Sequence, residues 1–400
     1  MKRVLFLSFY FPPRNRISSY RAAGFCRHLP SFDWEPVVIC EDWPDHAPGY
    51  DDELAIGLES TEIHRIQSYG PRGLNRFLVR NVIPWILPHK TPYNWWRPAI
   101  RKAIEICKIK EFDAIVATHD PLPTLTIAAD ISARFGIPWV ADLRDSWNMH
   151  RLSSPRKQRM IAKHEKRLVG MADQIVSVSD EMTEELGRIL DRRVHTVSNG
   201  FDFPSTRPSL RSTGKAFSIL YAGNLNLKRQ NPMPLLEAIQ ECISNGKIPR
   251  DSIHVHFLGT SPDIIQYLDS RRFPDVHLVF GGRVKRNQAL STISAASVLW
   301  VIAPQGEKGV LTGKVFDYLG SGRPILSIPD DGGEVGRLLD KTKSGFSLSS
   351  PHEINLKLLD LFDQWKRNCD FVLDFDKREI RRHERKVKAR QLAGVLDLLH

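Results

Sequence analysis

The segment RVLFLSFYF, residues 3–11, is a continuous apolar run, and two prolines at 12–13 close it. A strand whose two faces are both covered by helices reads as an uninterrupted apolar run, whereas a strand with one wet face alternates. A helical pattern follows at 18–29, and then a second strand-like segment, EPVVIC, at 35–40. This alternation predicts an α/β domain built on a parallel sheet.

The same alternation begins again in the second half of the chain. Residues 203–216, FPSTRPSLRSTGKA, are rich in Pro, Ser, Thr and Arg, which is typical of a linker. The strand-like FSILYAGN at 217–224 follows, and further strand and helix patterns lead to TGKVFDYLGSGRPIL at 312–326. We therefore predict two doubly wound Rossmann-like domains that face a cleft. The predicted domain boundaries are residues 1–204 and 205–375.

Charge and cysteine content narrow the classes of function. Lysine and arginine outnumber the acidic residues by 57 to 46, a net charge of +11. This charge suits a phosphorylated substrate, an anionic lipid or a nucleic acid, and a merely basic surface is the alternative. The five cysteines form no CxxC pair and no metal-ligand spacing, so we expect a reduced, cytoplasmic protein without a metal site. The apolar N-terminus is too short for a signal peptide, and no window reaches the length of a membrane span.

Polar side chains follow nearly every predicted strand, and ligands of doubly wound sheets bind beyond the carboxyl ends of the strands. In the first half these side chains are Ser18, Ser19 and Arg21, His119 and Asp120, and Asp142, Arg144 and Asp145. Any one of them is weak evidence alone. His119 by itself is more typical of a loop histidine than of a catalyst, and the DLRD segment could form an internal ion pair.

In the second half, the segment 312–326 predicts a helix with Lys314 in its first turn and Asp317 one turn further on. The free N–H groups and the macrodipole of a helix start favour an anion, so a cation there is costly unless a phosphate lies between. Lys228 and Arg229 stand in the loop after 217–224, and a carboxylate suits a ribose diol. Together these residues predict a nucleotide-diphosphate site. The alternative is a surface pair between Lys314 and Asp317, worth about 0.2–0.5 kcal/mol.

In this order the segments resemble the retaining glycosyltransferases of the GT-B fold, of the family 4 (group 1) type. The helix at 312–326 is similar to the donor-site helix of that family. FYFPPRNRISSYRAAGF, PWVADLRDSW, ADQIVSVSDEM and VSNGFD match in order in the first half, and LYAGNLNLKRQNP and GRVKRNQALSTISAASVLWVI match in the second. The resemblance covers nearly the whole chain.

The resemblance implies a nucleotide-sugar donor on the C-terminal domain and a glycan or lipid-linked acceptor on the N-terminal domain. It also implies transfer with retention of configuration, no metal and no cofactor. Asp317 occupies the ribose-binding position of the family's Glu-x7-Glu pattern, and Lys228, Arg229 and Lys314 stand where the diphosphate is held. A last helix, at 376–400, is expected to pack back on the first domain.

Three parts of the chain depart from the pattern of the family. The first loop has residues 15–19, NRISS, in place of the paired glycines that face the donor phosphates in that family. The first acidic position falls on Gly309, with Glu307 nearby, so the donor sugar is left open. Arg144 stands closest to the place of the usual active-site histidine. The predicted catalytic residues are Lys228, Arg229, Arg144 and Asp145. The predicted donor-binding residues are Gly223, Asn224, Gly259, Arg283, Val284, Thr312, Gly313, Lys314, Asp317, Ser18 and Ser19. The predicted acceptor-binding residues are Arg21, His119, Asp120 and Asp142.

Residues 70–104 mix Arg and Lys with Leu, Ile, Phe and three Trp, without an acidic residue. Such a stretch can dock on an anionic membrane, here at the inner face of the cell membrane; the alternative is an insertion whose aromatic side chains are partly core. Two other functions stay open: a non-hydrolysing nucleotide-sugar epimerase of the same fold, and a basic protein that binds membrane or nucleic acid without catalysis. We expect no nucleic-acid partner, because no recognised reading motif is present.

Overall fold

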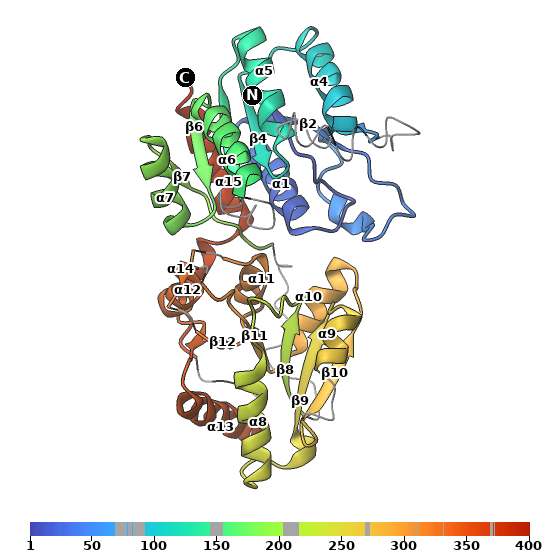
Figure 1. Cartoon of the computed structure of the whole chain (residues 1–400). Helices are drawn as coiled ribbons and strands as arrows, with labels where there is room; N and C mark the ends of the chain where they lie inside the picture. The colour runs from blue at the N-terminus through green and yellow to red at the C-terminus, as the bar shows by residue number, and fades with distance from the viewer. Residues whose placement is uncertain are drawn as a thin grey trace. The chain divides into compact units, whose positions relative to one another are not determined.

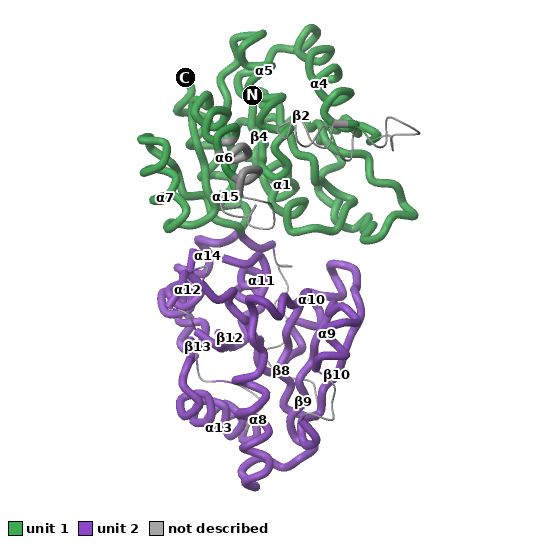
Figure 2. Tube along the Cα trace, viewed as in Figure 1, with its two compact units in different colours: residues 1–199, 385–400 green, residues 200–384 purple. Residues whose placement is uncertain are grey.

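The computed structural model describes residues 1–68, 78, 82, 93–144, 155–202, 216–268, 273–306, 308–309, 311–330, 332–368, 371 and 373–400. These residues form two compact units (Figure 2). Unit 1 comprises residues 1–199 and 385–400, and unit 2 comprises residues 200–384. Most of the predicted linker, residues 203–215, lies outside the described part of the chain.

Unit 1 contains a parallel sheet with strand order β3-β2-β1-β4-β5-β6-β7. The chain reverses its direction of winding between β1 and β4, which is the topology of a doubly wound sheet. The strands are β1 (Lys2–Leu7), β2 (Trp34–Glu41), β3 (Glu62–Ile66), β4 (Ala114–His119), β5 (Trp139–Leu143), β6 (Gln174–Ser177) and β7 (His195–Thr196). The helices are α1 (Ile17–His28), α4 (Tyr93–Cys107), α5 (Pro123–Phe135), α6 (Pro155–Gly170), α7 (Asp180–Leu190) and α15 (Arg385–Asp397).

Residues 4–7 of strand β1 are apolar because both faces of the strand are buried there. Leu5 and Leu7 belong to a core with side chains of α4 and α5, whereas Val4 and Phe6 belong to a core with side chains of α1 and α15. Helices α1 and α15 lie side by side although they are far apart in the sequence (Figure 1). The strand is therefore covered on both faces, as the uninterrupted apolar run predicts.

Unit 2 repeats this architecture with strand order β10-β9-β8-β11-β12-β13, again with parallel pairing. The strands are β8 (Phe217–Ala222), β9 (Ile253–Leu258), β10 (His277–Gly281), β11 (Val298–Val301), β12 (Ile325–Ser327) and β13 (Gly345–Ser347). The helices are α8 (Met233–Ser244), α9 (Pro262–Tyr267), α10 (Arg286–Ala295), α11 (Gly313–Ser321), α12 (Glu334–Thr342), α13 (Pro351–Asn368) and α14 (Lys377–Arg381). Short 3-10 helices lie at Leu29–Phe32, Asp52–Ala55 and Arg250–Ser252. The predicted pair of doubly wound Rossmann-like domains is confirmed.

The end of the chain forms two helices rather than one. Helix α14 belongs to unit 2, and α15 belongs to unit 1. The apolar face of α15, with Ala389, Leu392 and Leu396, is buried in the core that α1 also lines. The last helix is thus an integral part of the first unit.

The basic-aromatic segment is only partly described, because residues 69–77, 79–81 and 83–92 lie outside the described part of the chain. In its described portion, α4 buries Trp95 completely, and the ring of Trp95 packs edge-on against Phe9 at a centroid distance of 5.1 Å. Trp96 is half-buried beside the same core. None of the helices in the described ranges is both long and apolar enough to cross a membrane.

Candidate functional site

Three neighbouring strands of unit 2 end in glycine. Gly223 follows β8 and Gly259 follows β9, with φ of 112° and 79°, a region that favours glycine because it has no Cβ. The Gly223 N–H donates to the carbonyl of Leu258 at 2.7 Å, and the Gly259 N–H donates to the carbonyl of Gly281 at 2.8 Å. The carboxyl ends of β8, β9 and β10 therefore lie side by side and leave the main chain without side chains at this edge.

The loop after β8 carries the predicted diphosphate-binding residues Lys228 and Arg229. Lys228 is exposed and Arg229 is half-buried. The buried side chain of Gln230 donates to the carbonyl of Ile302 at 2.7 Å, just beyond β11, and the Arg229 carbonyl accepts from the N–H of Gln305 at 2.7 Å. The loop is thus tied to the carboxyl end of the next strand in the sheet. Sequence reasoning did not single out Gln230, since a lone glutamine carries no recognisable signal.

Helix α11 begins where the sequence predicts, at Gly313, with Thr312 as its N-cap. Thr312 makes no side-chain capping hydrogen bond, and its buried Oγ1 has no partner among the described residues. The Lys314 ammonium lies 3.8 Å from the centroid of the Tyr221 ring. It also lies 3.3 Å from the point where a Cβ on Gly223 would be. Burial lowers the pKa of Lys314 to about 7.

Asp317, the predicted ribose-binding residue, has a partner that the sequence did not indicate. Arg286 at the start of α10 donates from Nη1 to Asp317 Oδ2 at 2.7 Å and from Nη2 to Oδ1. The two side chains are 11% and 10% exposed. The alternative surface pair between Lys314 and Asp317 is therefore wrong: Asp317 is buried and held by a guanidinium from another helix. The i,i+3 spacing predicts contacts only between residues of one helix, so it could not predict a pair between α10 and α11.

The remaining predicted donor residues lie on both units. Asn224 is exposed, and its side-chain oxygen accepts from the N–H of Ser261 at 3.3 Å. Arg283 is exposed and Val284 half-buried, both between β10 and α10. In unit 1, Ser18 is half-buried on the first turn of α1. Ser19 is fully buried, and its Oγ has no hydrogen-bond partner within the described ranges.

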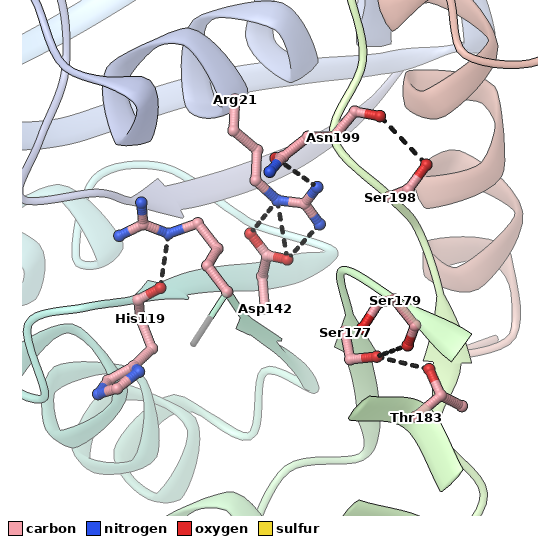
Figure 3. Close-up of polar contacts among 9 residues, drawn as sticks. Arg21, His119, Asp142, Ser177, Ser179, Thr183, Ser198 and Asn199 are labelled. Carbon is pink, nitrogen blue, oxygen red and sulfur yellow. Dashed lines mark hydrogen bonds and ion pairs between the residues drawn. The ribbon is translucent and has the colours of Figure 1, made fainter. Parts of the chain in front are cut away.

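Two predicted acceptor residues of unit 1 pair with each other (Figure 3). Arg21 on α1 donates from Nε and Nη2 to the carboxylate of Asp142 on β5, over 2.7–3.2 Å. Their side chains are 3% and 0% exposed. Arg21 Nη1 also lies 3.4 Å from the side-chain oxygen of Asn199. The cation that pairs with Asp142 thus comes from α1 and not from the DLRD segment itself, which was the alternative prediction.

Arg144 instead holds the main chain after β4. Its Nε donates to the His119 carbonyl at 2.6 Å, and its Nη2 donates to the Asp120 carbonyl at 2.8 Å. His119 is buried, and its Nε2 lies 3.9 Å from Asp120 Oδ1. The structure therefore brings together three of the predicted residues of this edge. The predicted catalytic residue Asp145, and Glu307 in unit 2, lie outside the described residues.

Hydroxyl groups that sequence reasoning missed line the ends of β6 and β7 (Figure 3). Ser177 Oγ hydrogen-bonds to Thr183 Oγ1 and donates to the Ser179 carbonyl, and Thr183 Oγ1 lies 2.7 Å from Thr196 Oγ1. Ser179 also caps α7 by accepting from the Met182 N–H. These hydroxyls bond to one another, which indicates a structural part in joining β6, β7 and α7. No group of three or more His, Cys, Asp and Glu in the described ranges is arranged to hold a metal ion.

Residues 19–203 match the model of Glycosyltransferase Family 4. No curated protein matches the chain. The chain is similar in structure to Anabaena Alr3699/HepE in complex with UDP-glucose, at 14% identity and a TM-score of 0.64 over 100% of both chains. It is also similar to the apo form of the lipopolysaccharide outer core galactosyltransferase WaaB, at 11% identity and 0.60 over 99% of both chains. The chain is similar, too, to a putative UDP-N-acetylglucosamine 2-epimerase from Listeria monocytogenes, at 13% identity and a TM-score of 0.59, over 99% of this chain and 96% of that chain. At these identities the structural similarities show the fold.

Proposed function

We propose that the protein transfers a sugar with retention of configuration, because it has the GT-B fold and its residues 19–203 match the model of Glycosyltransferase Family 4. The donor is a nucleotide-diphosphate sugar, and the acceptor is a glycan or a lipid-linked sugar of a cell-surface polysaccharide or glycoconjugate. The reaction needs neither metal nor cofactor. The protein works in the cytoplasm, at the inner face of the cell membrane.

One observation carries the proposal: the ammonium of Lys314, at the start of α11, lies beside Gly223 at the carboxyl end of β8. Lys314 stands in the first turn of α11 beside Gly223, and Lys228 is exposed on the loop that follows. Free N–H groups at a helix start, an ammonium group and main chain without side chains are what a diphosphate requires. Asp317, oriented by two hydrogen bonds from Arg286, keeps lone pairs for a ribose diol.

In the proposed reaction the bond between the anomeric carbon and the phosphate oxygen breaks, and a bond to the acceptor oxygen forms on the same face of the sugar. The acceptor hydroxyl gives its proton to the leaving phosphate, so no protein carboxylate acts as nucleophile. Negative charge grows on the diphosphate as the bond breaks. Lys228, Arg229 and Lys314 stabilise that charge, and one such group contributes about 10²–10³ in rate.

Unit 1 is proposed to hold the acceptor at the carboxyl ends of β4 and β5. The ion pair between Arg21 and Asp142 anchors α1 to the sheet, and Arg144 orients the main chain after His119. These contacts make a rigid edge on which Asp120, which is half-exposed, can bind an acceptor hydroxyl.

Product analysis with UDP-, GDP- and dTDP-sugars tests the function. Free nucleoside diphosphate together with a glycosylated acceptor supports transfer. A changed sugar that is still on its nucleotide would select the epimerase, which the similarity to the Listeria structure keeps as the second candidate. Binding that ignores nucleotide sugars and weakens steeply with salt would select a non-catalytic basic protein.

Single substitutions test the roles proposed for Lys314 and Arg229. Lys314→Ala and Arg229→Ala should each lower turnover by about 10²–10³ with the fold intact. Lys341→Ala, which removes an exposed cation from α12, is the matched control and should leave turnover unchanged. Near-normal turnover of both site variants would count against the proposed leaving-group site.

A further inference from the structure

Lys314 is half-buried beside an aromatic ring at the start of α11. Its ammonium packs on the face of the Tyr221 ring, and the missing Cβ of Gly223 leaves room for it. Asp317, the nearest carboxylate along α11, already receives both hydrogen bonds of Arg286. No ion pair or hydrogen bond to Lys314 exists among the described residues of the unit.

The other titratable groups around Lys314 do not compensate its charge. The Tyr221 hydroxyl on β8 donates to the Asn224 carbonyl. The Tyr318 hydroxyl on α11 accepts from the Ala222 N–H at 2.8 Å. Burial raises the pKa of both phenols, so neither supplies a negative charge. Arg286 on α10 is cationic, and so are the side chains of Lys228 and Arg229 on the loop after β8.

The position of Lys314 at the start of α11 further disfavours the charged form of its side chain. Lys314 is the second residue of the helix, where the unsatisfied N–H groups and the macrodipole are positive. Burial and the helix start both favour the neutral amine in the empty site, against the cation–π contact with the Tyr221 ring, which favours the charged form. An incoming diphosphate reverses them, because its oxygens offer both negative charge and hydrogen-bond acceptors.

We propose that Lys314 Nζ, a neutral amine without an ion-pair or hydrogen-bond partner in the ligand-free site as far as the structure describes it, takes up one proton from solvent when the donor diphosphate binds. The inference rests on the proposed function, since it needs a nucleoside diphosphate in this site. It makes donor binding proton-coupled and assigns the proton to one atom, Lys314 Nζ. The positive charge that Lys314 contributes to the leaving diphosphate is thus created by binding, in addition to the basic side chains of Lys228 and Arg229.

The coupling has a defined sign. With a pKa of about 7 for free Lys314, the amine is mainly neutral above pH 7, and binding must then draw a proton from solvent. The Kd should therefore rise with pH, by about eightfold between pH 7.5 and 8.5, provided that the pKa in the complex lies well above 9. Between pH 7.5 and pH 6.5 the dependence should become shallower, because Lys314 is then increasingly charged before the ligand binds.

Titration calorimetry of UDP, GDP and dTDP at pH 8, in two buffers of different ionisation enthalpy, measures the coupling directly. The nucleotide that binds should take up about 0.9 proton per site. Its own terminal phosphate, with a pKa of about 6, is already ionised at this pH and contributes little. Uptake below about 0.2 proton, together with a Kd that does not change from pH 7.5 to 8.5, would overturn the inference while leaving the glycosyltransferase proposal intact.

Variants assign the proton. Lys314→Arg carries a permanent charge and should bind with no proton uptake and with a flat pH profile. Lys314→Met should bind more weakly and also without uptake. Lys341→Arg on the exposed face of α12 is the control and should behave as the wild type. Uptake that persists in Lys314→Arg would assign the proton to another group, and absence of binding by all three nucleotides would remove the proposed function itself.

Discussion

Replacing Arg21 by methionine should destabilise unit 1 far more than the loss of an ordinary surface ion pair. The carboxylate of Asp142 is fully buried, and it receives hydrogen bonds from Nε and Nη2 of Arg21. Methionine fills similar space but leaves a buried charge without a partner, which costs about 3–5 kcal/mol. With a denaturant slope of about 2 kcal/mol/M, this corresponds to a fall of about 1.5–2.5 M in the urea midpoint.

Urea unfolding of the wild type and the variant checks this value. Amide hydrogen exchange in α1 and β5 separates the two units, which need not unfold together. The variant Arg21→Met/Asp142→Leu removes both charges and should recover most of the lost stability, because well-packed apolar residues often replace a buried pair without loss. The reasoning fails if Arg21→Met costs less than about 1 kcal/mol, or if the double variant is as unstable as the single one.

Three further predictions follow from the described contacts of the two units. Gly345→Ala should destabilise unit 2 by about 3 kcal/mol or more, because the new Cβ would lie 1.9 Å from a main-chain oxygen of β12. Gly394→Ala in α15 would place its Cβ where nothing lies within 4 Å, and it should stabilise unit 1 by about 0.5–1 kcal/mol. Thermal unfolding of the two variants measures both changes. Arg286→Lys should weaken nucleoside-diphosphate binding about tenfold, because an ammonium cannot hold both oxygens of Asp317; an unchanged Kd by titration would contradict this. Lys228→Ala should lower turnover about 10²-fold without changing the melting temperature, and a large melting shift would indicate a structural part instead.

The positions of the strands and of helix α11 could be predicted from the sequence because they depend on local patterns. The run at 3–11 indicated a strand with both faces covered, and β1 (Lys2–Leu7) is one. The strand ends at Leu7, before the apolar run ends. Phe9 and Phe11 are buried as well, although they lie beyond the strand. A continuous apolar run predicts which residues are buried, but it does not predict where the hydrogen bonds between the strands end.

The sequence alone determined the fold class, the repeat of two units and the helix start at Gly313, because apolar periodicity, glycine and proline act over a few residues. Only the tertiary structure decided which charges meet. Arg21 and Asp142 are 121 positions apart, and Arg286 and Asp317 are 31 apart. A chain with 57 basic and 46 acidic residues offers many such pairings, and the packing of helices on the sheets selects among them. The same packing places the ammonium of Lys314 over the Tyr221 ring, and burial there lowers the pKa of this residue.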